Sequence, residues 1–148
     1  MSVVGIYHAG LTVGDIERSI DFYCDLLGME LAWRQSSDSP YISQLTGLAG
    51  THLLVAYLRP QDSDGPYVEL LQYMAPPGTP IDPTPNNPGT AHVCFFVEDL
   101  DREYDRLVET GVKFVSEPNL ITAGVHAGSK TVYLYDPDGI RVELFQRG

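Results

Sequence analysis

Four ionisable residues occupy matching positions in the two halves of this 148-residue sequence. His8 and His92 each precede an aspartate by seven residues, and Glu69 and Glu143 each lie in a Val-Glu-Leu sequence. Imidazole nitrogens and carboxylate oxygens are the donors that bind divalent transition metals in proteins. The pattern therefore predicts one metal site built from two histidines and two glutamates.

The donor types limit the metal without selecting one. Mixed nitrogen and oxygen ligation suits zinc, nickel, cobalt, manganese or iron(II), and it leaves positions for water or substrate. The sequence has two cysteines, Cys24 and Cys94, which form neither a disulfide framework nor a CxxC motif. We therefore expect one divalent ion per site and no thiolate-rich structural zinc.

The elements that position these residues also repeat. Asp15 and Asp99 are typical N-caps, and the helices that they begin are expected to end at Gly28 and Gly111. Strand-like segments follow at residues 30–34, 51–58 and 67–73 in the first half, and at residues 113–116, 131–135 and 140–146 in the second. With the strands that contain the two histidines, the order β, α, β, β, β occurs twice.

A segment rich in proline and glycine, at about residues 75–90, separates the two halves. We therefore expect one α+β domain over residues 1–148, with a module at about 1–74 and another at about 91–148. The predicted fold is two βαβββ modules that form a curved, open mixed β-sheet barrel around a metal cavity, with the helices outside.

Alternation along the strands places the four candidate ligands on one kind of face. Val68 and Leu70 flank Glu69 and form the apolar face of their strand, so Glu69 points to the opposite side. The same reasoning holds for Glu143 and for the two histidines. If the helices cover the apolar faces, the ligands line the cavity, where ionisable groups need a partner or a metal to offset desolvation.

Charge and hydropathy exclude several kinds of partner. The formal net charge of -11 opposes binding to nucleic acid, which relies on clustered lysine and arginine. No apolar run is long enough to span a membrane, and the amino terminus does not resemble a secretory signal. We expect a cytoplasmic protein with a small-molecule substrate.

At the level of motifs the sequence resembles the vicinal oxygen chelate superfamily. This superfamily includes glyoxalase I, methylmalonyl-CoA epimerase, extradiol dioxygenases, and the fosfomycin and bleomycin resistance proteins. The resemblance covers nearly the whole chain, and its most specific parts are His8 with residues 12–15, the run at residues 22–29, residues 91–92 with 97–100, and residues 133–139 followed by Val142-Glu143-Leu144.

The ligand set is similar to that of the glyoxalase I or epimerase-like branch, where four strands each give one ligand. Related epimerases have glutamine where Glu69 stands. The resemblance implies a metal-dependent lyase or isomerase that chelates two adjacent substrate oxygens and shifts a proton through an enediolate or enolate. Glu143 or Glu69 would move the proton. It also implies a homodimer, and leaves open whether modules pair within one chain or between chains.

Two other functions remain open at this point. An Fe(II) extradiol dioxygenase would use His8, His92 and Glu143, but a carboxylate at Glu69 crowds that arrangement. A non-catalytic protein that binds an antibiotic or another small molecule is the second alternative. Proteins of that kind generally lack the metal ligands, so the complete set in this sequence argues against it.

Residues near the cavity that we expect to contact substrate are few, because the loops carry no binding motif. His52 is isolated in the sequence and is interpreted as an ordinary polar residue. His126 lies in a glycine-flanked loop that is able to cover the cavity. The candidate substrate contacts are Arg34, Tyr41, Cys94, His126 and Tyr133.

Overall fold

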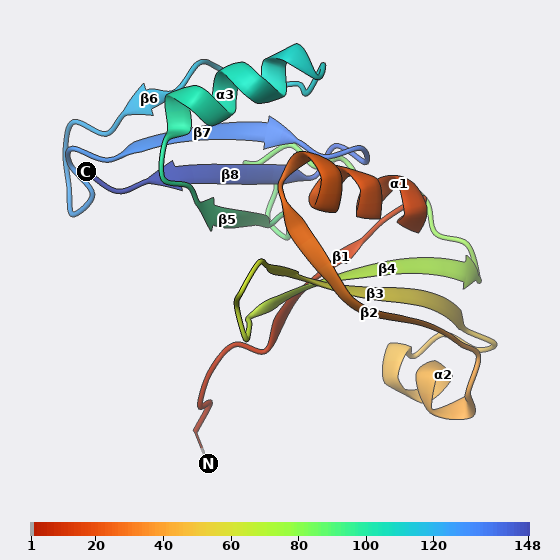
Figure 1. Cartoon of the computed structure of the whole chain (residues 1–148). Helices are drawn as coiled ribbons and strands as arrows, with labels where there is room; N and C mark the ends of the chain where they lie inside the picture. Colours follow the sequence, from red (N-terminus) through yellow and green to blue (C-terminus); the bar gives the residue numbers. More distant parts are fainter. Residues whose placement is uncertain (1) are drawn as a thin grey trace. The chain divides into compact units, whose positions relative to one another are not determined.

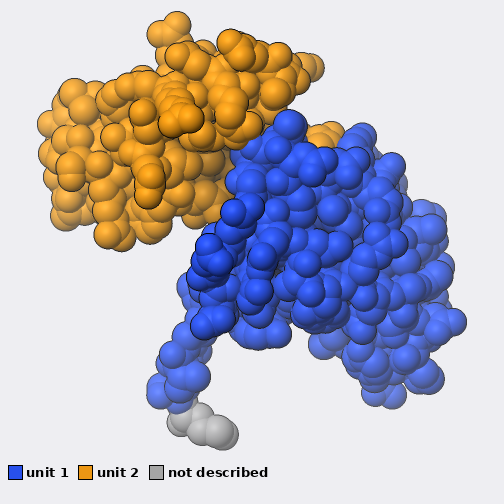
Figure 2. Space-filling view, viewed as in Figure 1, with its two compact units in different colours: residues 1–80 blue, residues 81–148 orange. Residues whose placement is uncertain are grey.

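The computed structural model describes residues 2–148 and consists of two compact units, one ending at Pro80 and the other beginning at Ile81 (Figure 2). This boundary lies in the segment that the sequence predicts as the linker, where prolines prevent a helix or a central strand. Each unit has its own sheet. Within the described residues, no helix is long and apolar enough to cross a membrane.

The first unit contains a four-stranded sheet and its helices (Figure 1). The sheet order is β1-β4-β3-β2, with β1 parallel to β4 and the other pairs antiparallel. The elements are β1 (His8–Thr12), α1 (Ile16–Asp21), the π-helix η1 (Phe22–Leu26), β2 (Met29–Ser37), α2 (Pro40–Thr46), β3 (His52–Pro60) and β4 (Tyr67–Ala75).

The second unit repeats this topology, with the sheet order β5-β8-β7-β6 and a parallel pair between β5 and β8. Its elements are β5 (His92–Phe96), α3 (Leu100–Glu109), β6 (Asn119–Leu120), β7 (Lys130–Tyr135) and β8 (Arg141–Gln146). The predicted α+β class with two βαβββ modules is confirmed. Over residues 2–148 neither sheet closes into a barrel, and the predicted metal cavity stays a prediction.

Equivalent hydrogen bonds tie each helix to its own sheet. The side-chain oxygen of Gln72 accepts a hydrogen bond from the backbone N–H of Ile16 at 3.0 Å, and Gln146 accepts from Leu100 at 2.8 Å. Each bond satisfies a backbone donor in the first turn of a helix, which has no partner inside the helix. The repeat in the sequence is therefore a repeat of specific contacts.

The two predicted N-caps are also confirmed. The Asp15 carboxylate accepts hydrogen bonds from the backbone N–H groups of Glu17 and Arg18, and Asp99 accepts one from Arg102. These bonds fix the point at which each chain segment leaves its first strand and turns into the helix. They therefore set which face of the sheet the helix covers.

Each sheet buries one face beneath its helix. The helix α1 contacts β3 and β4, and α3 contacts β8. In β4 and β8 the buried residues alternate with the glutamates, as the sequence predicts. The face beneath the helices contains Ala56, Leu58, Val68 and Leu70 in the first unit, and Val132, Leu134, Val142 and Leu144 in the second.

The helix α2 is not predicted from the sequence, where no element is expected between residues 34 and 51. The helix begins at Pro40, and it ends at Gly47, which adopts the left-handed conformation with φ of 72°. Ile42 packs in a cluster with Leu53, Val55 and Tyr57. Figure 1 shows α1 and α2 on opposite sides of the first sheet.

The strand predicted at residues 113–116 is wrong in its extent. Only an isolated bridge joins Phe114 to Leu134, and the regular pairing resumes in the two-residue strand β6. Pro118 lies between these segments and has no backbone N–H to donate. The ladder is therefore interrupted where the sequence suggested a continuous strand.

Replacing Leu134 by alanine tests the core of the second unit. Leu134 is 0% exposed, so the substitution leaves a cavity beneath α3 and is expected to lower the free energy of unfolding by about 2–5 kcal/mol. Urea denaturation measures the change. The control Leu45→Ala removes the same atoms from a side chain that is 75% exposed and should change stability by less than about 0.5 kcal/mol. Equal losses in both variants would contradict the assigned core.

Candidate metal centre

The first unit brings two of the predicted ligands together. His8 in β1 and Glu69 in β4 lie on neighbouring parallel strands, and His8 Nε2 is 3.1 Å from Glu69 Oε2. The Glu69 side chain is only 15% exposed, whereas His8 is 34% exposed. One carboxylate oxygen and one imidazole nitrogen thus face each other on the side of the sheet away from α1.

The second oxygen of Glu69 is held by a phenol. Tyr57 in β3 lies directly opposite Glu69, and its hydroxyl donates a 2.6 Å hydrogen bond to Glu69 Oε1. The same hydroxyl oxygen is 3.4 Å from His8 Nδ1. Because its one proton goes to Glu69, the hydroxyl faces His8 Nδ1 as an acceptor. A metal bound at His8 Nε2 would require the tautomer with the proton on Nδ1, and this contact accommodates that tautomer.

Aromatic rings hold Tyr57 in this position. Trp33 stacks on it with ring centroids 4.2 Å apart and an interplanar angle of 14°. Tyr7 and Tyr67 contact the ring from other directions, with centroids at 6.1 and 5.7 Å. Burial and the hydrogen bond to Glu69 raise the pKa of Tyr57 above its ordinary value, so its hydroxyl remains a donor.

The second unit contains an equivalent pair with a different support. His92 Nε2 is 3.1 Å from Glu143 Oε2, and the Glu143 side chain is again 15% exposed. The hydroxyl of Thr131 in β7 donates a 2.6 Å hydrogen bond to Glu143 Oε1. Both glutamates therefore have one oxygen fixed by a hydroxyl and the other directed toward a histidine.

Tyr133 is the structural equivalent of Tyr57 but makes a different contact. It lies opposite Glu143, as Tyr57 lies opposite Glu69. Its hydroxyl is 3.5 Å from His92 Nε2, and its ring is perpendicular to the imidazole at 5.2 Å. Burial and the charge of Glu143 raise the pKa of Tyr133. The predicted contact residue Tyr133 thus lies beside the second pair.

Two other predicted contact residues lie on the same side of the second sheet. Cys94 is opposite Glu143 in the pairing of β5 with β8. Partial burial of its thiol and the negative charge of Glu143 raise the pKa of Cys94 to about 12, so the thiol stays protonated at neutral pH. His126 contacts the ring of Phe145, two residues beyond Glu143, with centroids 5.3 Å apart. A lid role for His126 stays a prediction.

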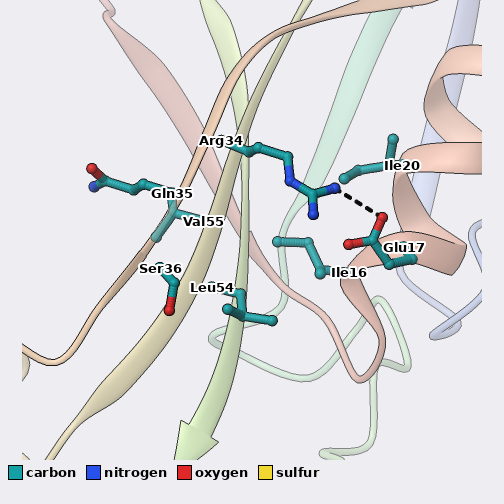
Figure 3. Close-up of a pocket in the computed structure, with 8 residues that line it drawn as sticks. All are labelled: Ile16, Glu17, Ile20, Arg34, Gln35, Ser36, Leu54 and Val55. Atoms are coloured by element: carbon teal, nitrogen blue, oxygen red, sulfur yellow. Dashed lines mark hydrogen bonds and ion pairs between the residues drawn. The ribbon is translucent and has the colours of Figure 1, made fainter.

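The remaining predicted contacts belong to the first unit and lie on different faces. Tyr41 in α2 is close enough to Tyr57 to contribute to its raised pKa. Arg34 instead lies beside α1, where Nη1 donates a 3.0 Å hydrogen bond to Glu17 in a shallow pocket (Figure 3). The structure therefore does not bring Arg34 to the His8–Glu69 pair.

The geometry of each pair fits a metal ligand set. Bonds of about 2.1 Å at nearly right angles place two ligand atoms about 3 Å apart, and both His–Glu pairs have this spacing. The nitrogen and oxygen atoms of a hydrogen-bonded ion pair are also about 3 Å apart, so this distance alone does not identify a metal site. Within residues 2–148 the ligand types occur as pairs, since no three histidine, cysteine or acidic side chains form one group. The joint site of four residues stays a prediction.

The hydroxyl donors Tyr57 and Thr131 are not predicted from the sequence. Their positions follow from the pairing of the strands, which places residues of β3 and β7 beside the glutamates. A polar side chain on the ligand face of the strand before each glutamate is the available signal. This signal is weak in the first half of the sequence, because residues 51–58 are mostly apolar and read as a buried strand.

Comparison with known proteins identifies the family. A family model described as the Glyoxalase/Bleomycin resistance protein/Dioxygenase superfamily matches residues 5–144. A protein named "Probable lactoylglutathione lyase" from Synechocystis sp. is 30% identical over 141 residues, covering 95% of this chain and 94% of its own length. A 2-epi-5-epi-valiolone epimerase from Actinomyces sp. is 29% identical over 147 residues, covering 95% of this chain and 78% of its own length.

Solved structures support the fold. A glyoxalase family protein from Bacillus cereus has a TM-score of 0.84 at 21% identity, covering 99% of this chain and 96% of its own. The trypanothione-dependent glyoxalase I of Leishmania major has a TM-score of 0.70 at 21% identity, covering 97% of this chain and 87% of its own. At these identities the likeness concerns the fold alone.

Removing the phenol oxygen of Tyr57 tests its role in holding Glu69. We expect Tyr57→Phe to weaken metal binding about tenfold to a hundredfold, because Glu69 and His8 lose the group that orients both. Titration of the metal-free protein with Co²⁺, followed by visible absorption, measures the affinity. The control Tyr104→Phe removes a hydroxyl from α3 and should bind Co²⁺ as the unchanged protein does. Unchanged affinity in Tyr57→Phe would refute the role.

Proposed function

Because this chain belongs to the Glyoxalase/Bleomycin resistance protein/Dioxygenase superfamily, we propose that it is a metal-dependent lyase or isomerase of the glyoxalase or epimerase type. Its relatives include proteins named as a lyase and as an epimerase. The observation that carries the proposal is the duplicated histidine–glutamate pair, with one oxygen of each glutamate fixed by a hydroxyl.

In the proposed site, His8, Glu69, His92 and Glu143 hold one divalent ion. When bound, such an ion is a Lewis acid that stabilises negative charge developing on two adjacent substrate oxygens. The hydroxyls of Tyr57 and Thr131 keep the glutamate oxygens in place before substrate arrives. This arrangement lowers the reorganisation that the reaction requires.

The proton transfer in this proposal belongs to Glu143. Glu69 is the more constrained carboxylate, because its hydroxyl partner Tyr57 is only 7% exposed and lies among stacked rings. Glu143 is held by the short side chain of Thr131, which is partly exposed. Glu143, whose hydroxyl partner is less tightly packed, is therefore better able to reorient toward a proton on the carbon next to a substrate carbonyl.

Loss of the Glu143 carboxylate tests this assignment. We expect Glu143→Gln to lower turnover about 10²–10⁴-fold, the usual contribution of a general base, while a large part of the metal binding remains. Exchange of the carbon-bound proton for deuterium in D2O, followed by NMR, measures the step. S-lactoylglutathione and a cyclic polyhydroxyketone are suitable test compounds, as representatives of the lyase and epimerase reactions.

The control is Glu109→Gln, which makes the same chemical change at the exposed end of α3. It should retain full exchange activity. Full activity in Glu143→Gln would remove Glu143 from the proton transfer.

Metal analysis of protein purified without added metal tests the wider proposal. We expect the protein to contain one equivalent of nickel, cobalt, zinc or manganese per site. Treatment with a chelator should remove both the metal and the activity. Iron accompanied by oxygen uptake in the presence of a catechol would instead establish an extradiol dioxygenase. Failure to bind any divalent metal would overturn the proposal.

A further inference from the structure

Arg141 is a basic residue without an acidic partner. Four other basic side chains form ion pairs with carboxylates, namely Arg34, Arg59, Arg106 and Lys130. Arg141 forms no ion pair within residues 2–148, although the chain has a formal net charge of -11. Arg102, Lys113 and Arg147 also form no ion pair there, so Arg141 is distinguished by its position and its hydrogen bonding.

The position of Arg141 places it on the ligand face of the second unit. It lies opposite His92 in the pairing of β5 with β8, and two residues before Glu143 on the same side of β8. Its guanidinium carbon is 5.3 Å from the ring centroid of Tyr135 and 5.8 Å from that of Tyr133. The two rings fix the guanidinium next to the histidine–glutamate pair.

The hydrogen bonds of Arg141 are incomplete. Its Nε atom is buried and has no hydrogen-bond partner in the part of the chain described. Nη2 reaches the hydroxyl of Tyr135 only at 3.4 Å. A buried donor without an acceptor is costly, and an arginine fork is suited to the two oxygens of a carboxylate or phosphate. The side chain therefore has unused capacity to bind an oxyanion.

The first unit differs from the second at the position that corresponds to Arg141. Tyr67 lies opposite His8 as Arg141 lies opposite His92, so the equivalent position is aromatic. Tyr67 there joins the aromatic rings that surround Tyr57. Arg59 is the cation near this position in the first unit, and it interacts with Tyr67 and forms an ion pair with Glu30. Arg141 in the second unit forms no such pair within residues 2–148.

We propose that Arg141 binds an anionic group of the substrate, a carboxylate or a phosphate, which is separate from the two adjacent oxygens that define the reaction. The proposal rests on the proposed function, because it places the anionic group of the substrate beside the His92–Glu143 pair of the proposed metal site. It names a substrate class, anionic hydroxyketones or acyl compounds, and it makes Arg141 the residue that selects them over neutral analogues.

Three hydroxamates test this selection, because each offers two adjacent oxygens to a metal but they differ in the tail. Acetohydroxamate has a neutral methyl tail, malonomonohydroxamate has a carboxylate, and phosphonoacetohydroxamate has a phosphonate. Dissociation constants are measured by calorimetry on the protein loaded with Co²⁺. We expect at least one anionic compound to bind about tenfold or more tightly than acetohydroxamate, and the better tail identifies the anion.

The variant Arg141→Gln should lose this preference while it binds acetohydroxamate with unchanged affinity. Arg106→Gln is the matched control, because it removes the same charge from α3, where Arg106 pairs with Glu103. It should keep the preference. Equal binding of all three hydroxamates by the unchanged protein would overturn the inference and leave the proposed function in place.

A second measurement does not depend on the metal. Burial is expected to slow the exchange of the Nε–H group of Arg141 with water, so that its NMR cross-peak can be observed and identified by its absence in Arg141→Gln. Titration of the metal-free protein with malonate and with inorganic phosphate should shift this peak in a saturable manner, and the Arg106 peak should not follow. If neither anion moves the Arg141 peak, the inference is wrong, whatever the outcome of the metal experiments.

Discussion

The hydrogen bond from a cross-strand hydroxyl to one oxygen of a glutamate is the interaction on which both ligand pairs depend. A carboxylate that is only 15% exposed on a sheet loses much of its hydration and needs a donor to compensate. Tyr57 and Thr131 provide that donor at 2.6 Å. Because each hydroxyl occupies Oε1, the other oxygen is directed toward the histidine. The hydrogen bond that supports the carboxylate therefore also sets the geometry of the histidine–glutamate pair.

This constraint explains why the backbone repeats more faithfully than the side chains. The parallel pairing of the first and last strands, and the glutamine that binds the first turn of the helix, recur in both units because they set the register between histidine and glutamate. The hydroxyl needs only to reach the carboxylate. It comes from a residue directly opposite Glu69 in one unit, and from Thr131, two residues before the position opposite Glu143, in the other.

Strand parity and the repeat were sufficient to predict that His8 and Glu69, and His92 and Glu143, share a face of their sheets, because alternation along a strand is a local property. The N-caps were predictable for the same reason. Tyr57 was not, since its role depends on how β3 pairs with β4, which is a long-range contact. The helix α2 was missed because apolar periodicity was weak over seven residues, although Pro40 and Gly47 mark its ends. Arg34 was expected beside the substrate, but a bulge in β2 and the pairing with Glu17 decide its position.

The two units have diverged in the chemistry that surrounds a common pair. In the first, Trp33, Tyr67 and Tyr7 pack around Tyr57, so the space beside the ligands is filled with rings that make the pair rigid. In the second, the short side chain of Thr131 donates to Glu143, the hydroxyl of Tyr133 lies near His92 Nε2, and Arg141 forms no ion pair within residues 2–148. One side chain cannot both hold a metal ligand rigidly and bind a substrate, because a fully packed side chain has no hydrogen-bond donors left for the substrate. In the proposed site, the first unit would hold the metal rigidly, and Arg141 of the second unit would contact the substrate anion.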